Sequence, residues 1–415
     1  MNLPNKRIAL IGCGMIGREH LRAWEAVAEA VPRTFEIVAV CDSDPELATR
    51  ARTQVAAWQV TKPIVFTSIQ NLLNGVMIDG LDVCLPVYLH QSTACTALNR
   101  GINVLVEKPL AQSVAAAREM IGTAEANGCV LSLAENHRRS ISIRTAHWLL
   151  WDRAEIGVPE IFHAQRIRYQ DPRPQEWHWR TCRRMGGGGW AIDNGAHFLD
   201  TMRYLFGPVE TVSAVAKRTT DQPLFYKGQP SGVDQREDLL AGLLRFTNGM
   251  TGVFSSASHL PGNDVFHFSI QGTEGSIVDD GGQLFHAPLP TAIVRDQGGA
   301  VRQLKEYEDD FLGSLSAGER ERLFPFGLQG DFSVECGEFL RAISSEEPVE
   351  IGGQSALETL ATSLAFYESA VSGTAVSVAD VLAGIVNSYQ QSLDEATSTL
   401  PYDFGNYRTR WSAHG

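Results

Sequence analysis

The first 135 residues alternate between short apolar runs and amphipathic stretches. Residues 6–11 and 35–41 are apolar without alternation, a pattern typical of parallel strands that are covered on both faces. Between these runs, apolar residues recur from Ile16 to Val31 at the spacing of a helix. The same rhythm predicts further strands at 81–85, 103–106 and 129–133, and helices at 91–100 and 114–124. Repeated strand–helix units of this length predict a doubly wound parallel sheet.

The second half of the chain has a different pattern. Strand-like runs separated by turn residues such as Asn248-Gly249 indicate another sheet, at 209–217, 239–246, 250–256 and 265–271. The stretch from Asp193 to Phe206 predicts a helix packed across that sheet. Residues 379–396 have a helical period. The aromatic segment PYDFGNYRTRW that follows is expected to pack on the protein or on a neighbouring subunit.

The sequence GCGMIG, residues 12–17, follows the first predicted strand and opens the first predicted helix. In that setting a GxGxxG motif lets the backbone approach a pyrophosphate at the helix N-terminus. The expected cofactor contacts in this motif are Gly12, Gly14, Met15, Ile16 and Gly17. Asp42 closes the second strand and would accept hydrogen bonds from the adenosine ribose. Because its carboxylate repels a 2′-phosphate, NAD is favoured over NADP, although Arg50 and Arg52 nearby weaken that preference.

Composition and charge narrow the class of protein. The 415 residues include 35 basic and 48 acidic side chains, a formal charge of −13 that disfavours binding to nucleic acid or to an anionic membrane. No apolar run approaches the roughly 20 residues of a membrane span, and no signal peptide precedes the first strand. The 7 cysteines are scattered without a CxxC pair, which predicts a reducing compartment and no metal site. We therefore expect a cytoplasmic protein.

The stretch GGGGWAIDNGAHFLD, residues 186–200, carries the strongest candidate chemistry. Asp193 and His197 lie one helical turn apart, so their side chains share a face. Histidine, with a pKa of about 6.5, suits general acid–base catalysis near neutral pH. Gly195 between them removes a side chain where a ligand would need room, and the glycine run is expected to fold tightly against a neighbour, with cofactor and substrate as candidates. The alternative is an Asp–His pair with a purely structural role.

Three segments resemble the Gfo/Idh/MocA family, named for glucose–fructose oxidoreductase and inositol dehydrogenase. LPVYLHQSTACTALNRGINVLVEKPLAQS, residues 85–113, resembles the family's TPxxxH, helix and GKHVLxEKPLA pattern. Residues 186–200 resemble its GGGxLxDxGxHxxD, and residues 332–378 resemble its C-terminal helix pair. Leu85 and Val87-Tyr88 depart from the family's usual Thr and Asn-His, so the nicotinamide surroundings are expected to differ locally.

The resemblance implies a two-domain α/β enzyme. The N-terminal part would be a Rossmann-type doubly wound parallel sheet that binds NAD, and the C-terminal part an α+β domain with a large open, mostly antiparallel sheet. We place these domains at 1–135 and 136–378, followed by a C-terminal helix and tail at 379–415. One face of the open sheet would be free for subunit association, which implies a homodimer or homotetramer.

The resemblance also implies how three side chains converge on the substrate carbinol beside the nicotinamide. His197 would act as general acid or base, Asp193 would orient it or hold a neighbouring substrate hydroxyl, and Lys108 would polarise the reacting oxygen. The roles of Lys108 and His197 could be exchanged. Further cofactor contacts are implied for Pro86, His90, Glu107, Lys108 and Asn136.

An arginine-rich segment between His163 and Met185 bears on the substrate. Aromatic faces pack on sugar rings, and arginines bind carboxylate, phosphate or sulfonate groups. We therefore expect a carbohydrate-like small molecule, with an anionic group on it as a further hypothesis. The candidate substrate contacts, besides Asp193 and His197, are Arg138, Trp177, Trp179, Arg180 and Arg184. As alternatives, the arginines of the segment pair with acidic residues across a subunit interface, and Arg138 is a solvated linker charge.

The function predicted from these observations is an NAD-dependent dehydrogenase that oxidises a secondary hydroxyl of a sugar, sugar derivative or cyclitol. A second hypothesis is an NAD-dependent glycoside hydrolase that works by transient oxidation, elimination, water addition and reduction. A third is a non-catalytic NAD-binding regulator, against which the presence of Lys108, Asp193 and His197 together argues.

Overall fold

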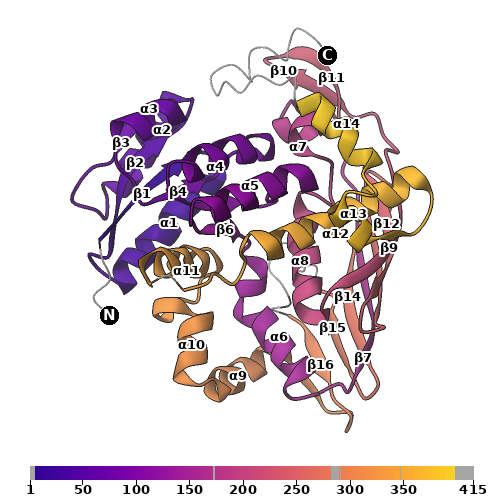
Figure 1. Cartoon of the computed structure of the whole chain (residues 1–415). Coiled ribbons are helices and arrows are strands. Elements are labelled where there is room, and N and C mark those ends of the chain that lie inside the picture. The colour runs from indigo at the N-terminus through magenta and orange to yellow at the C-terminus, as the bar shows by residue number, and fades with distance from the viewer. Residues whose placement is uncertain (1–4, 172, 282–288, 290, 346, 398–415) are drawn as a thin grey trace. The chain divides into compact units, whose positions relative to one another are not determined.

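The computed structural model describes residues 5–171, 173–281, 289, 291–345 and 347–397, and these fall into two compact units (Figure 1). Unit 1 comprises residues up to 136 together with 316–357, and unit 2 comprises 137–315 together with 358–397. This division differs from the sequence-based boundaries, which placed 316–357 in the second domain. The physical reason is that the chain returns to unit 1: the backbone N–H of Leu133 donates to the carbonyl of Ile351 at 2.9 Å.

Unit 1 is built on a six-stranded parallel sheet with strand order β3-β2-β1-β4-β5-β6. Its strands are β1 Lys6–Ile11, β2 Phe35–Cys41, β3 Ile64–Phe66, β4 Gly80–Val83, β5 Asn103–Glu107 and β6 Leu131–Ala134. The first two predicted strands are confirmed residue for residue, whereas β4 ends earlier and β6 begins later than predicted. Within β1, Ile8 to Ile11 have no exposed surface, as expected of a strand covered on both faces.

The helices of the Rossmann-like part alternate with these strands, which confirms the doubly wound arrangement. They are α1 Met15–Ala30, α2 Pro45–Val55, α3 Ile69–Gly75, α4 His90–Leu98 and α5 Val114–Ala126. Asp44 caps α2 by accepting hydrogen bonds from the backbone N–H groups of Glu46 and Leu47, and Pro45 occupies the first turn. A second group from later in the chain, α10 Ala317–Leu323 and α11 Asp331–Ser345, completes unit 1, and α11 packs against α1.

Unit 2 is built on a nine-stranded sheet with strand order β17-β16-β15-β14-β7-β13-β12-β9-β18. Its pairs are antiparallel except for β13 with β7. The strands are β7 Pro159–Arg168, β9 Val209–Lys217, β12 Leu239–Phe246, β13 Thr251–Ser258, β14 Val265–Gly272, β15 Ser276–Asp279, β16 Ile293–Arg295, β17 Val301–Gln303 and β18 Val376–Ser377. The large, mostly antiparallel sheet predicted for this region is confirmed.

The core of unit 2 lies between this sheet and the helix α8 Asn194–Phe206. The Phe162 ring on β7 stacks on Phe206 of α8 with the ring centroids 5.6 Å apart. Gly252 on β13 allows this approach, because a Cβ there would lie 2.3 Å from the Phe162 ring. Further helices of the unit are α6 Ile141–Trp151, α7 Arg183–Gly186, α9 Glu308–Ser314 and the later part of α12 Gly353–Ser372.

A three-stranded sheet in unit 2 was not predicted from the sequence. It contains β8 Gln175–Glu176, β10 Pro223–Tyr226 and β11 Gln229–Val233, in the order β11-β10-β8. The strands are short and mostly exposed, so they lack the apolar runs from which strands were predicted. This small sheet fixes the arginine-rich segment, because β8 lies inside it.

The C-terminal region contains two helices rather than the single helical stretch predicted for 379–396. They are α13 Val378–Ala383 and α14 Ser388–Thr397. Gly384 ends α13 with a φ of +75°, a left-handed conformation that favours glycine and stops the helix. The segment PYDFGNYRTRW lies outside the described residues. Within the part of the chain that the structure describes, no helix is long and apolar enough to cross a membrane.

Candidate active site

The glycines of the loop after β1 have three different roles. Gly12 has a φ of +95°, and a Cβ there would lie 2.2 Å from the carbonyl oxygen of Cys84. A Cβ on Gly17 would lie 1.9 Å from the carbonyl oxygen of Gly12, so this glycine lets α1 start close to the strand. A Cβ on Gly14 would meet open space. Gly12 and Gly17 are therefore required by close backbone neighbours, whereas Gly14 leaves open space. The glycines of dinucleotide-binding loops divide their roles in the same way.

Asp42 holds this loop in place. Its Oδ2 accepts a hydrogen bond of 2.7 Å from the backbone N–H of Cys13, and its Oδ1 accepts one of 2.9 Å from that of Asp44. The carboxylate thus joins the glycine loop to the turn that starts α2. The predicted contact of Asp42 with the adenosine ribose stays a prediction.

His90 links two loops at the carboxyl edge of the parallel sheet. Its Nδ1 lies 2.9 Å from the carbonyl oxygen of Pro109, and its Nε2 lies 2.8 Å from that of Leu85. The ring has no exposed surface, and burial lowers the pKa of His90 although the two carbonyl groups favour the charged form. His90 therefore links the loop after β4 to the loop after β5. The cofactor contacts of His90 and Pro86 stay predictions.

Lys108 follows directly after β5, at the carboxyl edge where open α/β sheets bind ligands. It is half-buried, and its backbone N–H donates a hydrogen bond of 3.0 Å to Oε2 of Glu107. The backbone conformation at Lys108 thus depends on what holds the Glu107 carboxylate in place. Asn136, at the end of the first segment of unit 1, is buried.

In unit 2, the glycine run before α8 folds against side chains of its own unit. The backbone N–H of Gly189 lies 2.9 Å from both the Tyr367 hydroxyl and Oε2 of Glu237. A Cβ on Gly188 would lie 2.7 Å from the Tyr367 oxygen, and one on Gly189 would lie 2.4 Å from the Glu237 carboxylate. The close neighbours that require these glycines are therefore Tyr367 and Glu237, which corrects the interpretation that cofactor and substrate impose them.

Gly195 needs the same correction. A Cβ at this position would lie 2.7 Å from the carbonyl oxygen of Trp190 and 2.8 Å from its ring. The Trp190 ring in turn stacks on Phe254 with centroids 4.4 Å apart. Gly195 is thus required by packing at the start of α8, and not by room for a ligand.

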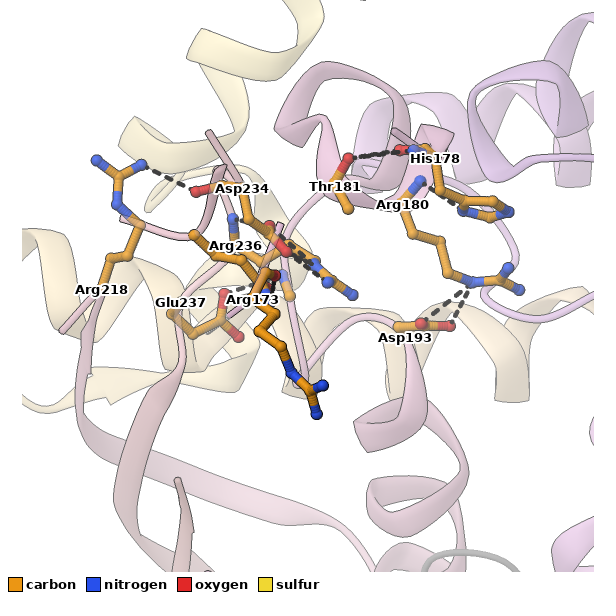
Figure 2. A network of polar contacts seen from close by, with 11 residues as sticks. Arg173, His178, Arg180, Thr181, Asp193, Arg218, Asp234, Arg236 and Glu237 are labelled. Carbon is orange, nitrogen blue, oxygen red and sulfur yellow. Dashed lines mark hydrogen bonds and ion pairs between the residues drawn. The ribbon is translucent and has the colours of Figure 1, made fainter. Parts of the chain in front are cut away.

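Asp193 occupies the N-cap position of α8 and forms an ion pair with Arg180 (Figure 2). Arg180 Nε lies 3.2 Å from Oδ2 of Asp193, and the two side chains are 32% and 25% exposed. The Arg180 guanidinium also lies over the Trp179 ring, 4.3 Å from its centroid. The pair is thus partly open to solvent, and Arg180 orients the carboxylate.

His197 lies in the first turn of α8 and is half-buried. Its ring stacks on the buried ring of His137, with centroids 4.1 Å apart and an angle of 14° between the rings. His137 was not among the predicted site residues. Its sequence signal is its place in the segment Asn136-His137-Arg138-Arg139, between Asn136 and Arg138, two predicted site residues.

Arg138 is buried and pairs with Asp200 on α8 through both Nε and a terminal nitrogen. Thr359 Oγ1 donates a further hydrogen bond of 2.9 Å to the same carboxylate. Burial opposes ionisation, but the Arg138 guanidinium holds the pKa of Asp200 below its ordinary value. The alternative that Arg138 is a solvated linker charge is therefore wrong. Its predicted substrate contact is untested, and its guanidinium already binds Asp200.

Several arginines of the segment 163–185 have partners within the chain. Arg173 Nε lies 3.0 Å from Oδ2 of Asp171, and Arg183 lies over the Tyr389 ring at 4.3 Å and donates to Ser392 at 2.6 Å. Arg184 is exposed, and Trp177 is half-buried against Tyr226. Partners inside the chain, such as Asp171 for Arg173 and Asp193 for Arg180, thus account for part of the local positive charge.

The predicted catalytic residues are divided between the two units. Lys108, like the glycine loop and Asp42, belongs to unit 1, whereas Asp193 and His197 belong to unit 2, where α8 carries both. The 7 cysteines all lie in the described part of the chain and are free thiols.

Comparison with known proteins places the chain in a family. Residues 6–135 match the model of an oxidoreductase family's NAD-binding Rossmann fold, and residues 152–378 match the C-terminal alpha/beta domain of the same family. A levoglucosan dehydrogenase of Pseudarthrobacter phenanthrenivorans is 27% identical over 296 residues, 66% of this chain and 74% of that protein. A 1,5-anhydro-D-fructose reductase of Ensifer adhaerens is 26% identical over 378 residues, 90% of this chain and 98% of that protein.

A solved structure has the same fold. It is a levoglucosan dehydrogenase in complex with NADH and levoglucosan, which matches with a TM-score of 0.72 at 23% identity and covers 90% of this chain and 99% of that chain. The two family matches span most of the sequence in the order expected, from the glycine loop through the EKP segment to the C-terminal helices. The chain therefore belongs to the Gfo/Idh/MocA family of oxidoreductases, with an NAD-binding Rossmann fold at its N-terminus.

Proposed function

We propose that this protein is an NAD-dependent dehydrogenase that oxidises a secondary hydroxyl of a sugar or sugar derivative. The observation that carries the proposal is a complete set of parts: the open glycine loop with Asp42, and Lys108, Asp193 and His197 at the positions that the family resemblance assigns. The names of the relatives support the substrate class, because both the levoglucosan dehydrogenase and the 1,5-anhydro-D-fructose reductase act on sugars.

The residues of the glycine loop fit the cofactor. Gly14 leaves open space at the N-terminus of α1, where backbone N–H groups and the helix dipole favour a pyrophosphate. Asp42 would bind the ribose hydroxyls next to it. NAD, when bound there, supplies the hydride acceptor for the carbon-bound hydrogen of the substrate.

The side chains of this protein would handle the proton and the substrate. His197 would take the hydroxyl proton as general base, and its stack on His137 restricts the orientation of the ring. Asp193, fixed by Arg180, would accept a hydrogen bond from the imidazole or from a neighbouring substrate hydroxyl. The Lys108 ammonium would stabilise negative charge that develops on the reacting oxygen. We keep open the exchange of roles between Lys108 and His197.

The contacts of Arg180 favour an uncharged sugar. Its guanidinium is shared between Asp193 and the Trp179 ring, so a carboxylate or phosphate on the substrate would compete with Asp193 for it. The exposed Arg184 and the half-buried Trp177 are the remaining candidates for outer contacts with the substrate.

The test is a panel of neutral sugars, acidic sugars, cyclitols and aryl glycosides, each mixed with the purified protein and NAD. We expect NADH to accumulate with at least one neutral sugar, and replacement of His197 by alanine to abolish turnover while NAD still binds. Release of the aglycone from a glycoside without net NADH would establish the glycoside hydrolase instead. NAD binding without turnover of any member would favour the regulator.

We also propose that the outer face of the nine-stranded sheet mediates assembly into a homodimer or homotetramer. Val215, Leu243 and Ile293 on its strands are 57%, 45% and 46% exposed, and a partner subunit on this face would cover them. Light scattering on the purified protein tests this, and replacement of Leu243 by lysine should produce monomers. A wild-type protein that is monomeric at micromolar concentration would refute it.

A further inference from the structure

A cluster of charged side chains surrounds His20 in the interior of unit 1. His20 lies in the second turn of α1, and neither it nor Asp82 on β4 has any exposed surface. The Nδ1 atom of His20 lies 3.0 Å from both oxygens of Asp82. The Trp24 indole donates a hydrogen bond of 2.9 Å to the same carboxylate. Nδ1 of His20 is thus fixed by the Asp82 carboxylate, and Trp24 on α1 holds that carboxylate in place.

The second ring nitrogen of His20 faces two more carboxylates. Its Nε2 lies 3.1 Å from Oε1 of Glu107, at the end of β5, and 3.6 Å from Oε1 of Glu335 on α11. Glu335 is fully buried, and α11 packs against α1 (Figure 1). A neutral imidazole has a single N–H and could donate to one side alone, whereas an imidazolium donates to both sides. The geometry therefore fits the charged form.

The electrostatics of the cluster agree with that geometry. Burial is the largest single influence and lowers the pKa of His20, but the polar neighbours, Asp82 first among them, together raise that pKa well above its ordinary value. Two thiols also lie near the ring, Cys84 directly after β4 and Cys336 on α11. Burial raises the pKa of both thiols, so they stay protonated and add no charge at neutral pH. One cation is thereby shared among Asp82, Glu107 and Glu335.

Glu107 connects this cluster to Lys108. Its Oε1 accepts from His20, and its Oε2 accepts the backbone N–H of Lys108 at 3.0 Å. A continuous path of hydrogen bonds therefore runs from Asp82 through His20 and Glu107 to the residue that the proposed function places beside the reacting oxygen. The path starts in the strand next to β5 and reaches Lys108 without passing through solvent-exposed groups.

We infer that His20 is a positioning residue for Lys108: as a buried imidazolium it holds Oε1 of Glu107, and Oε2 of the same carboxylate holds the backbone from which the Lys108 ammonium extends. The role of Lys108 in this inference rests on the proposed function. The charged state of His20 and its hydrogen bond with Glu107 do not depend on that function. A small displacement of a group that must meet the substrate costs up to about 100-fold in rate, so the path is expected to matter for turnover.

A metal centre is an alternative interpretation of the same cluster. One ligand atom each from His20, Asp82 and Cys336 lie within 4.8 Å of one another. A divalent cation would require a neutral imidazole and a thiolate, and it would displace the hydrogen bonds that His20 makes with Asp82 and Glu107. Both ring nitrogens of His20 are already directed at carboxylates, so the structure favours the proton over the metal.

The kinetic experiment compares four variants of the full-length protein: two single variants on the path, their double variant and a control. Glu107→Gln keeps the shape of the side chain but has one oxygen, so it cannot accept from His20 and from Lys108 together. His20→Gln removes the imidazolium. We expect each to lower kcat by about 10- to 100-fold with NAD affinity unchanged, and the double variant to be no slower than the slower single variant because both interrupt one path. Cys336→Ala, beside His20 but off the path, is the matched control and should keep the wild-type kcat.

Three kinetic results would overturn the inference. One is a wild-type kcat in Glu107→Gln, which would show that Lys108 does not depend on Glu107. Another is an equal loss of kcat in Cys336→Ala, which would mean that any damage to the cluster acts through stability. Loss of NAD affinity in proportion to kcat would assign Glu107 to the cofactor instead and would likewise overturn it.

An NMR experiment tests the cluster without measuring turnover, so its result does not depend on the proposed function. The ¹⁵N resonances of the His20 ring, assigned by their loss in His20→Gln, should show both nitrogens protonated at neutral pH, and Glu107→Gln should shift the titration to lower pH. A neutral ring in the wild type, or one equivalent of zinc by elemental analysis, would overturn the inference. If the wild type turns over no sugar while the ring is charged and Glu107→Gln shifts it, the proposed function fails and the link between His20 and Glu107 stands.

Discussion

The hydroxyl of Tyr367 accepts a hydrogen bond of 2.9 Å from the backbone N–H of Gly189 and donates one of 2.8 Å to Glu237. Tyr367 lies on α12, far along the chain from the glycine run. Its ring also stacks on Tyr389 of α14 with centroids 4.6 Å apart, and the Tyr389 hydroxyl donates to the carbonyl of Gly187 at 2.9 Å. Two late helices thus set the path of the loop that leads into Asp193 and His197.

The first prediction concerns these glycines. Gly188→Ala or Gly189→Ala should lower the free energy of unfolding by about 1–3 kcal/mol, because the new Cβ meets Tyr367 or Glu237 in a packed region. Gly313→Ala is the control: its Cβ would meet open space in the helix α9, so that change should be neutral or stabilising by up to about 1 kcal/mol. Urea unfolding measures all three. Equal effects in Gly189→Ala and Gly313→Ala would contradict the packing described here.

The second prediction concerns the buried ion pair of Arg138 with Asp200. Arg138→Met removes the guanidinium and leaves the Asp200 carboxylate buried, which should cost about 3–5 kcal/mol of unfolding free energy. Arg173→Met breaks the exposed pair with Asp171, where the arginine side chain is 81% exposed, and should cost at most about 1 kcal/mol. Thermal and urea unfolding compare the two. If the Arg138 variant were as stable as the Arg173 variant, Asp200 would have to be neutral in the folded protein.

The third prediction is a dependence of stability on pH that comes from Asp331. Burial and the nearby Glu135 raise the pKa of Asp331 from 3.8 to about 6. The folded state therefore holds a proton that the unfolded state has released, so the free energy of unfolding falls as the pH rises from about 4 to about 6. Asp331→Asn should remove this decline and stabilise the protein at pH 7 by about 1–3 kcal/mol. A variant with the wild-type pH profile would show that Asp331 titrates normally.

The fourth prediction concerns the orientation of Asp193. Arg180→Gln removes the ion pair that holds the carboxylate, and loss of a hydrogen bond to a charged group should lower kcat/KM for the sugar by about 10- to 100-fold. Arg173→Gln, in the same segment but paired with Asp171, should leave kcat/KM close to that of the wild type. Steady-state kinetics on both variants decide the matter. Higher activity on an acidic sugar than on neutral ones would instead assign Arg180 to the substrate.

The sequence predicted the parallel sheet well because its strands are local apolar runs, as at 6–11 and 35–41, where pattern and structure agree to the residue. It did not predict β8, β10 and β11, since these exposed strands carry no such pattern. The contacts of the glycine run were also missed. They come from Glu237 and Tyr367, and a glycine shows that something is close without showing what it is.

For the candidate site, the sequence supplied residue types but not their partners. Arg138 and Asp200 both stood in recognised segments, yet their pairing depends on how α8 packs beside the turn at 137–139. The acidic neighbours of His20 come from β4, β5 and α11, so no spacing in the sequence indicates the cluster. Long-range charge pairing of this kind follows from the fold and has no local signature.

The measurement that tests the central claim most directly is the formation of NADH by the purified protein with NAD and a neutral sugar from the panel. The account predicts steady NADH accumulation with the wild type, and loss of that signal with retained NAD binding in both Lys108→Met and His197→Ala. Undiminished NADH formation in both variants would contradict the assignment of the proton chemistry, and a wild type that binds NAD but forms NADH with no sugar would contradict the dehydrogenase itself.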